Sequence, residues 1–91
     1  MVLRVEQVPS DSGTVLTLIG RIDSPDVQDL KARVAEAPGP LVLDLQQVRL
    51  VDLDAVHFLA AAEQMGVELR HLPQYIREWL LLERPRLVEQ G

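Results

Sequence analysis

The chain has 91 residues, a formal charge of −5 and no cysteine. This length suits one small domain, and the lack of cysteine excludes disulfides, thiolate nucleophiles and zinc–sulfur sites. The acidic charge and the scattered basic residues argue against nucleic-acid binding, so a protein partner is expected. The N-terminus does not resemble a signal peptide and no apolar run reaches the ~20 residues that span a bilayer, which predicts a cytoplasmic domain without membrane insertion.

The first part of the chain is predicted to form a hairpin. Residues 3–8 alternate apolar and polar side chains, as a half-exposed strand does, and residues 14–19 are apolar and β-branched. Turn-forming residues fill positions 9–13 between them.

A helix is expected next. Ser24 is a good N-cap, Pro25 fits the first helical position, and Asp26 suits the positive end of the helix dipole. The Pro-Gly-Pro sequence at residues 38–40 ends this helix.

The central stretch contains a strand and a helix. Residues 41–45 form the near-continuous apolar run of a strand that is covered on both faces. Residues 46–49 are predicted to be a polar connection, and residues 53–65 favour a helix that Gly66 stops. The strand carries one carboxylate, and two more mark the start of the helix, so this acidic junction is the candidate functional region.

The remaining elements complete a small α/β domain. Residues 67–71 alternate as in a strand near a sheet edge, and a last helix is predicted from Gln74 to about Leu82, because Pro85 disfavours its continuation. The order β-β-α-β-α-β-α predicts a mixed four-stranded sheet with three flanking helices, in one domain over residues 1–83 and a tail over residues 84–91. The side chains expected to be largely buried are Val27, Leu30, Val34, Val42, Leu43, Val56, Leu59, Leu69 and Ile76.

The last helix is apolar on more than one face. Tyr75, Trp79 and Leu80 belong to this surplus of apolar side chains, which a single buried stripe does not explain. The sequence therefore predicts a homodimer or a partner protein docked on this helix, with Trp79 as the anchor.

The sequence gives little indication of a set of catalytic side chains. The only serines are in a turn or at a helix cap, so no Ser-His-Asp triad is predicted, and we expect no enzyme activity and no cofactor. One alternative stays open: Asp44, Asp52, Asp54 and His57 carry oxygen and nitrogen donors that could bind a metal or a small molecule.

Two segments together resemble the STAS domain family, which includes bacterial anti-sigma factor antagonists, regulatory domains of anion transporters and small subunits of lipid-transport assemblies. Residues 16–24 resemble the family's strand ending in Leu-x-Gly-x-Leu-Asp. Residues 41–45 and 48–52 resemble its strand ending in Asp-Leu and the start of its Asp-Ser-Ser-Gly-Leu helix. The resemblance covers roughly residues 14–82 and implies the family's fold.

The resemblance also assigns roles around the second helix. In the antagonists, the second serine of Asp-Ser-Ser-Gly is phosphorylated by a partner kinase, and Asp54 occupies that position here. Aspartate does not accept phosphate as serine does, although it offers part of the charge of phosphoserine. The partner surface implied by the resemblance consists of Asp23, Ser24, Asp52, Leu53, Asp54 and His57.

The resemblance implies a non-enzymatic protein-interaction module. The function expected is a phosphorylation-independent antagonist or regulatory subunit in a bacterial signalling or sigma-factor circuit. A small subunit of a lipid or anion transport assembly is the alternative within the same family.

Overall fold

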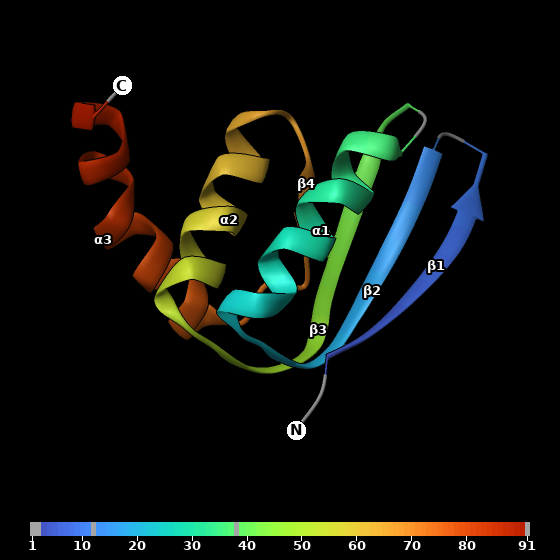
Figure 1. Cartoon of the computed structure of the whole chain (residues 1–91), viewed down its shortest axis with the longest axis horizontal. Helices are drawn as coiled ribbons and strands as arrows, with labels where there is room; N and C mark the ends of the chain where they lie inside the picture. Colours follow the sequence, from blue (N-terminus) through green and yellow to red (C-terminus); the bar gives the residue numbers. More distant parts are fainter. Residues whose placement is uncertain (1–2, 12, 38, 91) are drawn as a thin grey trace.

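The computed structural model describes the backbone of residues 3–11, 13–37 and 39–90, and the side chains within those ranges except at positions 10 and 84–90. The order of elements is the one predicted from the sequence (Figure 1). The elements are β1 (Arg4–Ser10), β2 (Gly13–Ile22), α1 (Ser24–Glu36), β3 (Leu41–Val51), α2 (Leu53–Gln64), β4 (Glu68–Arg70) and α3 (Gln74–Gln90).

The four strands form a mixed sheet in the order β1-β2-β3-β4, which confirms the predicted topology. β1 pairs with β2 in an antiparallel hairpin, whereas β3 is parallel to both of its neighbours. Two successive right-handed crossovers in the same direction place their helices on the same face of a sheet. Figure 1 shows this arrangement, with α1 and α2 side by side and α3 beyond α2.

The core lies between the sheet and α1 and α2. Alternate residues of β2 are buried against these helices, and Leu43 of β3 and Leu59 of α2 have no exposed surface. Six of the side chains expected to be largely buried are buried in the structure: Val27, Leu30, Leu43, Val56, Leu59 and Ile76. Three others are only half-buried: Val34, Val42 and Leu69.

β3 is longer than predicted. It runs from Leu41 to Val51 and includes residues 46–49, which the sequence indicated to be a connection. The pairing with β2 shifts register twice along this part of the strand, so β3 carries extra residues opposite β2. These irregularities break the alternation of buried and exposed side chains, which is why the consecutive polar residues Gln46 and Gln47 did not indicate a strand.

α3 also extends further than predicted. The expected end near Leu82 is wrong, because the helix continues across Pro85 to Gln90. Proline removes one backbone hydrogen bond and usually ends or kinks a helix, but it does not exclude helical backbone on either side. None of the helices in the described part of the chain combines the length and apolar character needed to cross a membrane.

The core assignment predicts the effect of truncating a buried side chain. Leu59→Ala should lower the free energy of unfolding by about 2–5 kcal/mol, because it removes buried methyl groups and leaves a cavity under α2. Met65→Ala is the matched control, since Met65 is 74% exposed and its truncation should change stability by less than about 0.5 kcal/mol. Urea unfolding of both variants measures the difference, and equal losses would contradict the assignment.

Candidate functional site

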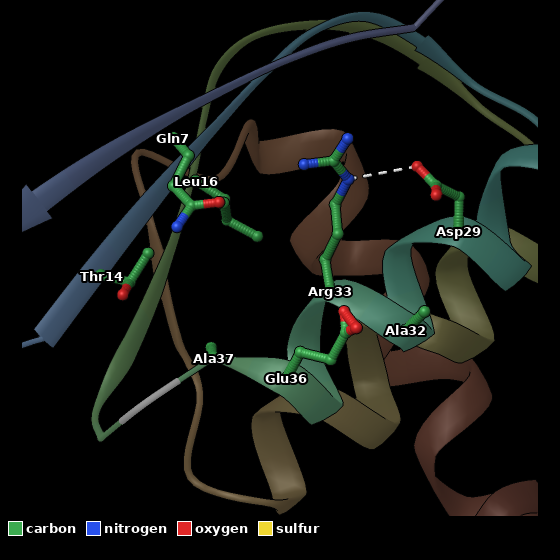
Figure 2. Close-up of a pocket in the computed structure, with 8 residues that line it drawn as sticks. All are labelled: Gln7, Thr14, Leu16, Asp29, Ala32, Arg33, Glu36 and Ala37. Carbon is green, nitrogen blue, oxygen red and sulfur yellow. Dashed lines mark hydrogen bonds and ion pairs between the residues drawn. The ribbon is translucent and has the colours of Figure 1, made fainter.

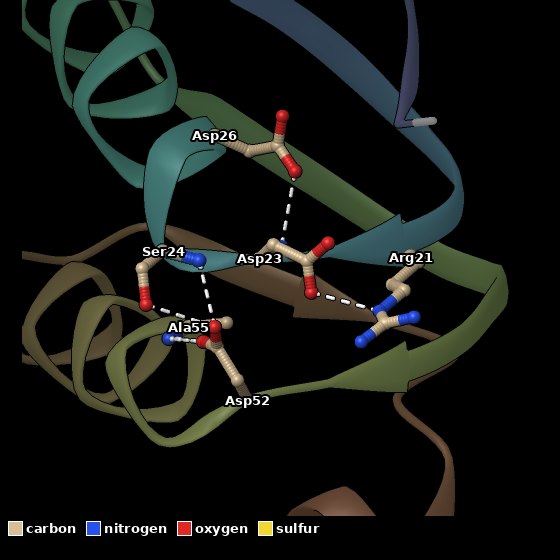
Figure 3. A network of polar contacts seen from close by, with 6 residues as sticks. All are labelled: Arg21, Asp23, Ser24, Asp26, Asp52 and Ala55. Atoms are coloured by element: carbon tan, nitrogen blue, oxygen red, sulfur yellow. Dashed lines mark hydrogen bonds and ion pairs between the residues drawn. The ribbon is translucent and has the colours of Figure 1, made fainter. Parts of the chain in front are cut away.

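The candidate site lies where the two crossover helices begin. β2 ends at Ile22 and leads through Asp23 into α1, while β3 ends at Val51 and leads through Asp52 into α2. Since β2 and β3 are parallel, their carboxyl ends lie at the same edge of the sheet. The N-termini of α1 and α2 are therefore neighbours, as Figure 3 shows.

Asp52 connects these two helix starts. Its Oδ1 accepts a hydrogen bond from the backbone N–H of Ala55 at 2.9 Å, which is the N-cap interaction of α2. Its Oδ2 accepts two more from the other segment, one from the Ser24 backbone N–H at 2.7 Å and one from the Ser24 hydroxyl at 2.9 Å. The backbone N–H of Asp52 donates to the Ile22 carbonyl at 3.2 Å. One residue thus caps α2 and holds the start of α1 in place (Figure 3).

The hydrogen bonds of Asp52 also set its protonation. Burial alone raises the pKa of this carboxyl group, but the bonds from Ala55 and Ser24, with the nearby positive charge of Arg21, outweigh that effect. The net result is a pKa below the ordinary value of 3.8. Asp52 is therefore ionised at neutral pH and is a weak acceptor for a proton from the Ser24 hydroxyl.

α1 begins one residue earlier than the sequence predicted. Asp23, not Ser24, is the N-cap, and Ser24 is the first helical residue. The Asp26 carboxylate accepts a hydrogen bond from the Asp23 backbone N–H at 3.0 Å, and the Asp23 carboxylate accepts one from Nε of Arg21 at 2.8 Å. The Ser24 hydroxyl is available for Asp52 because it does not cap its own helix.

Three of the predicted site residues line one groove. Ser24, Asp54 and His57 lie along a depression of about 350 Å³ between α1 and α2, together with Gln28 and Lys31 of α1. The last two were missed by the sequence analysis. Their spacing from Ser24, at i+4 and i+7 along a helix, is the signal that could have identified them.

Leu53, Asp54 and His57 differ in exposure. Leu53 is 46% exposed and Asp54 is exposed in the first turn of α2, so both are accessible to a partner. His57 is half-buried, and its Nε2 lies 2.9 Å from Oε1 of Glu83 in α3. His57 therefore links α2 to α3 at the border of the groove.

The structure does not gather the four residues of the metal-site alternative. The Asp44 carboxylate lies 3.3 Å from Nδ1 of His71, whereas Asp52 binds Ser24 and His57 binds Glu83. Among the residues whose placement is described, no three histidine or acidic side chains come together as metal ligands would. A single site built from Asp44, Asp52, Asp54 and His57 is therefore wrong for this fold.

The apolar surface of α3 is only partly as predicted. Leu80 has no exposed surface and packs in the core, so its assignment to an interface is wrong. Tyr75 is 47% exposed and its hydroxyl donates to the Arg49 carbonyl at 2.6 Å, while Trp79 is half-buried. Leu82 is 72% exposed, so an apolar stripe of Tyr75, Trp79 and Leu82 remains at the surface.

An ion pair holds α3 against α2, and the sequence did not indicate it. The guanidinium of Arg77 donates to both carboxylate oxygens of Glu63, at 3.0 and 2.8 Å. These hydrogen bonds raise the pKa of Arg77 above its ordinary value, against the opposing effect of burial. The two residues are on different helices, so their spacing in the sequence gives no signal.

Comparisons with known proteins agree with this fold. The family model described as "Mlab, STAS domain" matches residues 6–83, and the chain therefore belongs to the STAS domain family. A solved structure, described as an antisigma-factor antagonist STAS domain from Rhodobacter sphaeroides, is similar with a TM-score of 0.55 and 24% sequence identity. That similarity covers 75% of this chain and 83% of the other, and it confirms the α/β fold. Among curated protein sequences, none matches the chain.

The hydrogen bonds of Asp52 predict a pH-dependent contribution to stability. Asp52→Ala should lower the free energy of unfolding by about 1–2 kcal/mol at neutral pH, through loss of the cap and of the contacts with Ser24. Since the pKa is lower in the folded than in the unfolded state, this contribution is complete above the ordinary value of 3.8 and disappears as pH falls through the folded value.

Chemical denaturation of both proteins between about pH 2 and pH 7 tests this dependence. The difference between wild type and Asp52→Ala should be constant near neutrality and should shrink in acid. Asp29→Ala is the control, because it removes an exposed carboxylate paired with Arg33 and should cost less than about 0.5 kcal/mol. A difference that does not change with pH would contradict the ionic role of Asp52.

Proposed function

We propose that this STAS domain is a non-enzymatic protein-interaction module. Its partner surface would comprise the start of α1 and the first turns of α2, and its role would be that of a phosphorylation-independent antagonist or regulatory subunit. The observation that carries the proposal is the double hydrogen bond from Ser24 to Oδ2 of Asp52, which joins two distant segments into one surface.

The charge of this surface indicates its partner. Asp23, Asp26 and Asp54 lie at the N-termini of α1 and α2, and Asp54 is exposed. Complementary charge steers association and fixes the orientation of partners, so a basic surface on the partner fits here. Leu53, which is 46% exposed beside these carboxylates, supplies an apolar contact.

Position 54 favours a module that does not depend on a phosphate at this residue. The Asp54 carboxylate gives a permanent negative charge where the resemblance places a phosphorylatable serine. Phosphoserine carries about −1.5 to −2 charge units, so aspartate supplies part of that charge without a kinase. We infer that binding through this surface is constitutive.

The chemistry of the groove supports binding over catalysis. Ser24 is the only serine along it, and its hydroxyl donates to a carboxylate whose lowered pKa makes it a weak base. Activation of a serine nucleophile requires a base within hydrogen-bond reach that can take the proton. Ser24 is therefore better explained as part of the connection between α1 and α2.

The proposal predicts that Asp54→Ala affects binding more than folding. The substitution removes one exposed charge in the first turn of α2 and should lower the free energy of unfolding by about 1 kcal/mol or less. Its effect on affinity should be larger, about tenfold or more, if the partner places a cation opposite Asp54. Calorimetric titration with the partner purified from the source cell, together with thermal melting, measures both quantities.

Two controls sharpen this experiment. Asp29→Ala removes a carboxylate on another part of α1 and should leave affinity unchanged. Asp54→Ser restores a hydroxyl at position 54 without the charge, so it should weaken binding as Asp54→Ala does. Unchanged affinity in Asp54→Ala, with a lowered melting temperature, would show that Asp54 only stabilises the helix.

A second candidate function follows from α3. The stripe of Tyr75, Trp79 and Leu82 leaves apolar surface on the outer helix, and such surface usually marks a contact with another protein. A stable contact of this kind fits a subunit of a transport assembly, the alternative within the family, or a homodimer.

The α3 contact predicts the behaviour of a charged variant. Leu82→Glu should convert an assembly held by this stripe into monomers, because a carboxylate would be buried in an apolar contact without a partner. Light scattering measures the mass of both proteins, and Glu78→Gln is a control on the same helix. Two results together would contradict this role: the wild-type protein is monomeric at high concentration, and Leu82→Glu binds the partner as tightly as wild type does.

A further inference from the structure

A second cavity lies at the other end of α1. It has a volume of about 410 Å³ and is bounded by the helix-facing side of the β1–β2 hairpin and by the C-terminal half of α1 (Figure 2). Gln7 of β1 is paired with Leu16 of β2, so both side chains face the helix layer. The volume is within the range of sites that hold small molecules.

The walls of this cavity carry both signs of charge. Nε of Arg33 donates to Asp29 at 3.1 Å. Within the described residues, the two terminal nitrogens of this guanidinium make no hydrogen bond or ion pair. Glu36 follows Arg33 by three residues on the same helix, and in the part of the chain that the structure describes its carboxylate has no ion pair. A cation and an anion are thus available along one wall.

The opposite wall offers neutral polar groups. Thr14 is only 6% exposed, and across residues 3–11, 13–37 and 39–90 no hydrogen bond joins its hydroxyl to another protein group. A buried hydroxyl without a partner is unfavourable and is usually satisfied by water or by a ligand. The Gln7 amide faces the cavity from the neighbouring strand in Figure 2 and can both donate and accept.

The floor of the cavity is apolar. Leu16 is 1% exposed, and Ala32 and Ala37 line the cavity from α1 and the residue after it. A ligand with one charged end of each sign and a small apolar or neutral body would match the floor and both walls. Neither an anion nor a cation alone would satisfy both Arg33 and Glu36.

We propose that this cavity binds a free α-amino acid. The carboxylate of the ligand would accept hydrogen bonds from the terminal nitrogens of Arg33, in the paired geometry that guanidinium groups favour. Its ammonium group would donate to Glu36, and its side chain would lie over Leu16. Gln7 and Thr14 would supply the remaining hydrogen bonds. This site is separate from the partner surface and does not depend on the function proposed above.

Titration of the full chain with each proteinogenic L-amino acid, followed by two-dimensional NMR, tests the proposal. At least one amino acid should produce saturable shifts that include the amides of Gln7, Thr14 and Glu36. Its N-acetyl derivative lacks the ammonium group, and its amide derivative lacks the carboxylate. Each derivative should bind at least about tenfold more weakly than the amino acid itself.

Substitutions on α1 make the test specific to this cavity. Arg33→Gln and Glu36→Gln should each weaken binding about tenfold or more, because each removes one charged contact of the ligand. Lys31→Gln removes a charge from the same helix outside the cavity and should leave the affinity unchanged. The proposal is overturned if no amino acid gives saturable shifts, or if Arg33→Gln binds as tightly as Lys31→Gln. Circular dichroism of each variant shows whether α1 is retained.

Discussion

The hydrogen bonds of the Asp52 carboxylate hold together the edge of the domain where both crossovers begin. Residues 24 and 52 are far apart in sequence: Ser24 is the first residue of α1, and Asp52 is the N-cap of α2. One oxygen caps α2 and the other holds Ser24, so the two helix starts share a single acceptor. The same contacts lower the pKa of this carboxyl group below its ordinary value, so they favour its charged form.

α2 is the element on which the other layers depend. It packs against the sheet through side chains such as Leu59 and receives α3 on another side, so half of its 12 residues are buried. The Arg77–Glu63 pair and the His57–Glu83 contact join α3 to opposite ends of α2. The exposed residues of α2 are Leu53 and Asp54 in its first turn, Ala61 beside α1 and Gln64 in its last turn.

The sequence predicted the fold well where the periodicity of the apolar residues coincides with residues that end helices or strands. The alternation of strands with helices implied parallel pairing, and Pro-Gly-Pro after α1 and Gly66 after α2 marked two boundaries that the structure reproduces. It failed where tertiary context decides the outcome. Register shifts in β3 hid a strand behind consecutive polar residues, and the helix across Pro85 contradicts a rule based on local geometry. Leu80 was assigned to an interface because composition does not show which face of α3 meets α2.

The sequence predicted which segments carry the candidate site, but not which of their residues contact each other. Asp52 and Ser24 were both singled out, yet only the structure shows that they bind each other, since this pairing depends on two parallel strands ending together. Asp54 is the second residue of α2, where free backbone N–H groups and the helix dipole favour an anion. Phosphoserine and aspartate are stabilised there for the same physical reason. An aspartate at this position therefore fixes a negative charge at the start of α2 without weakening the helix that presents it.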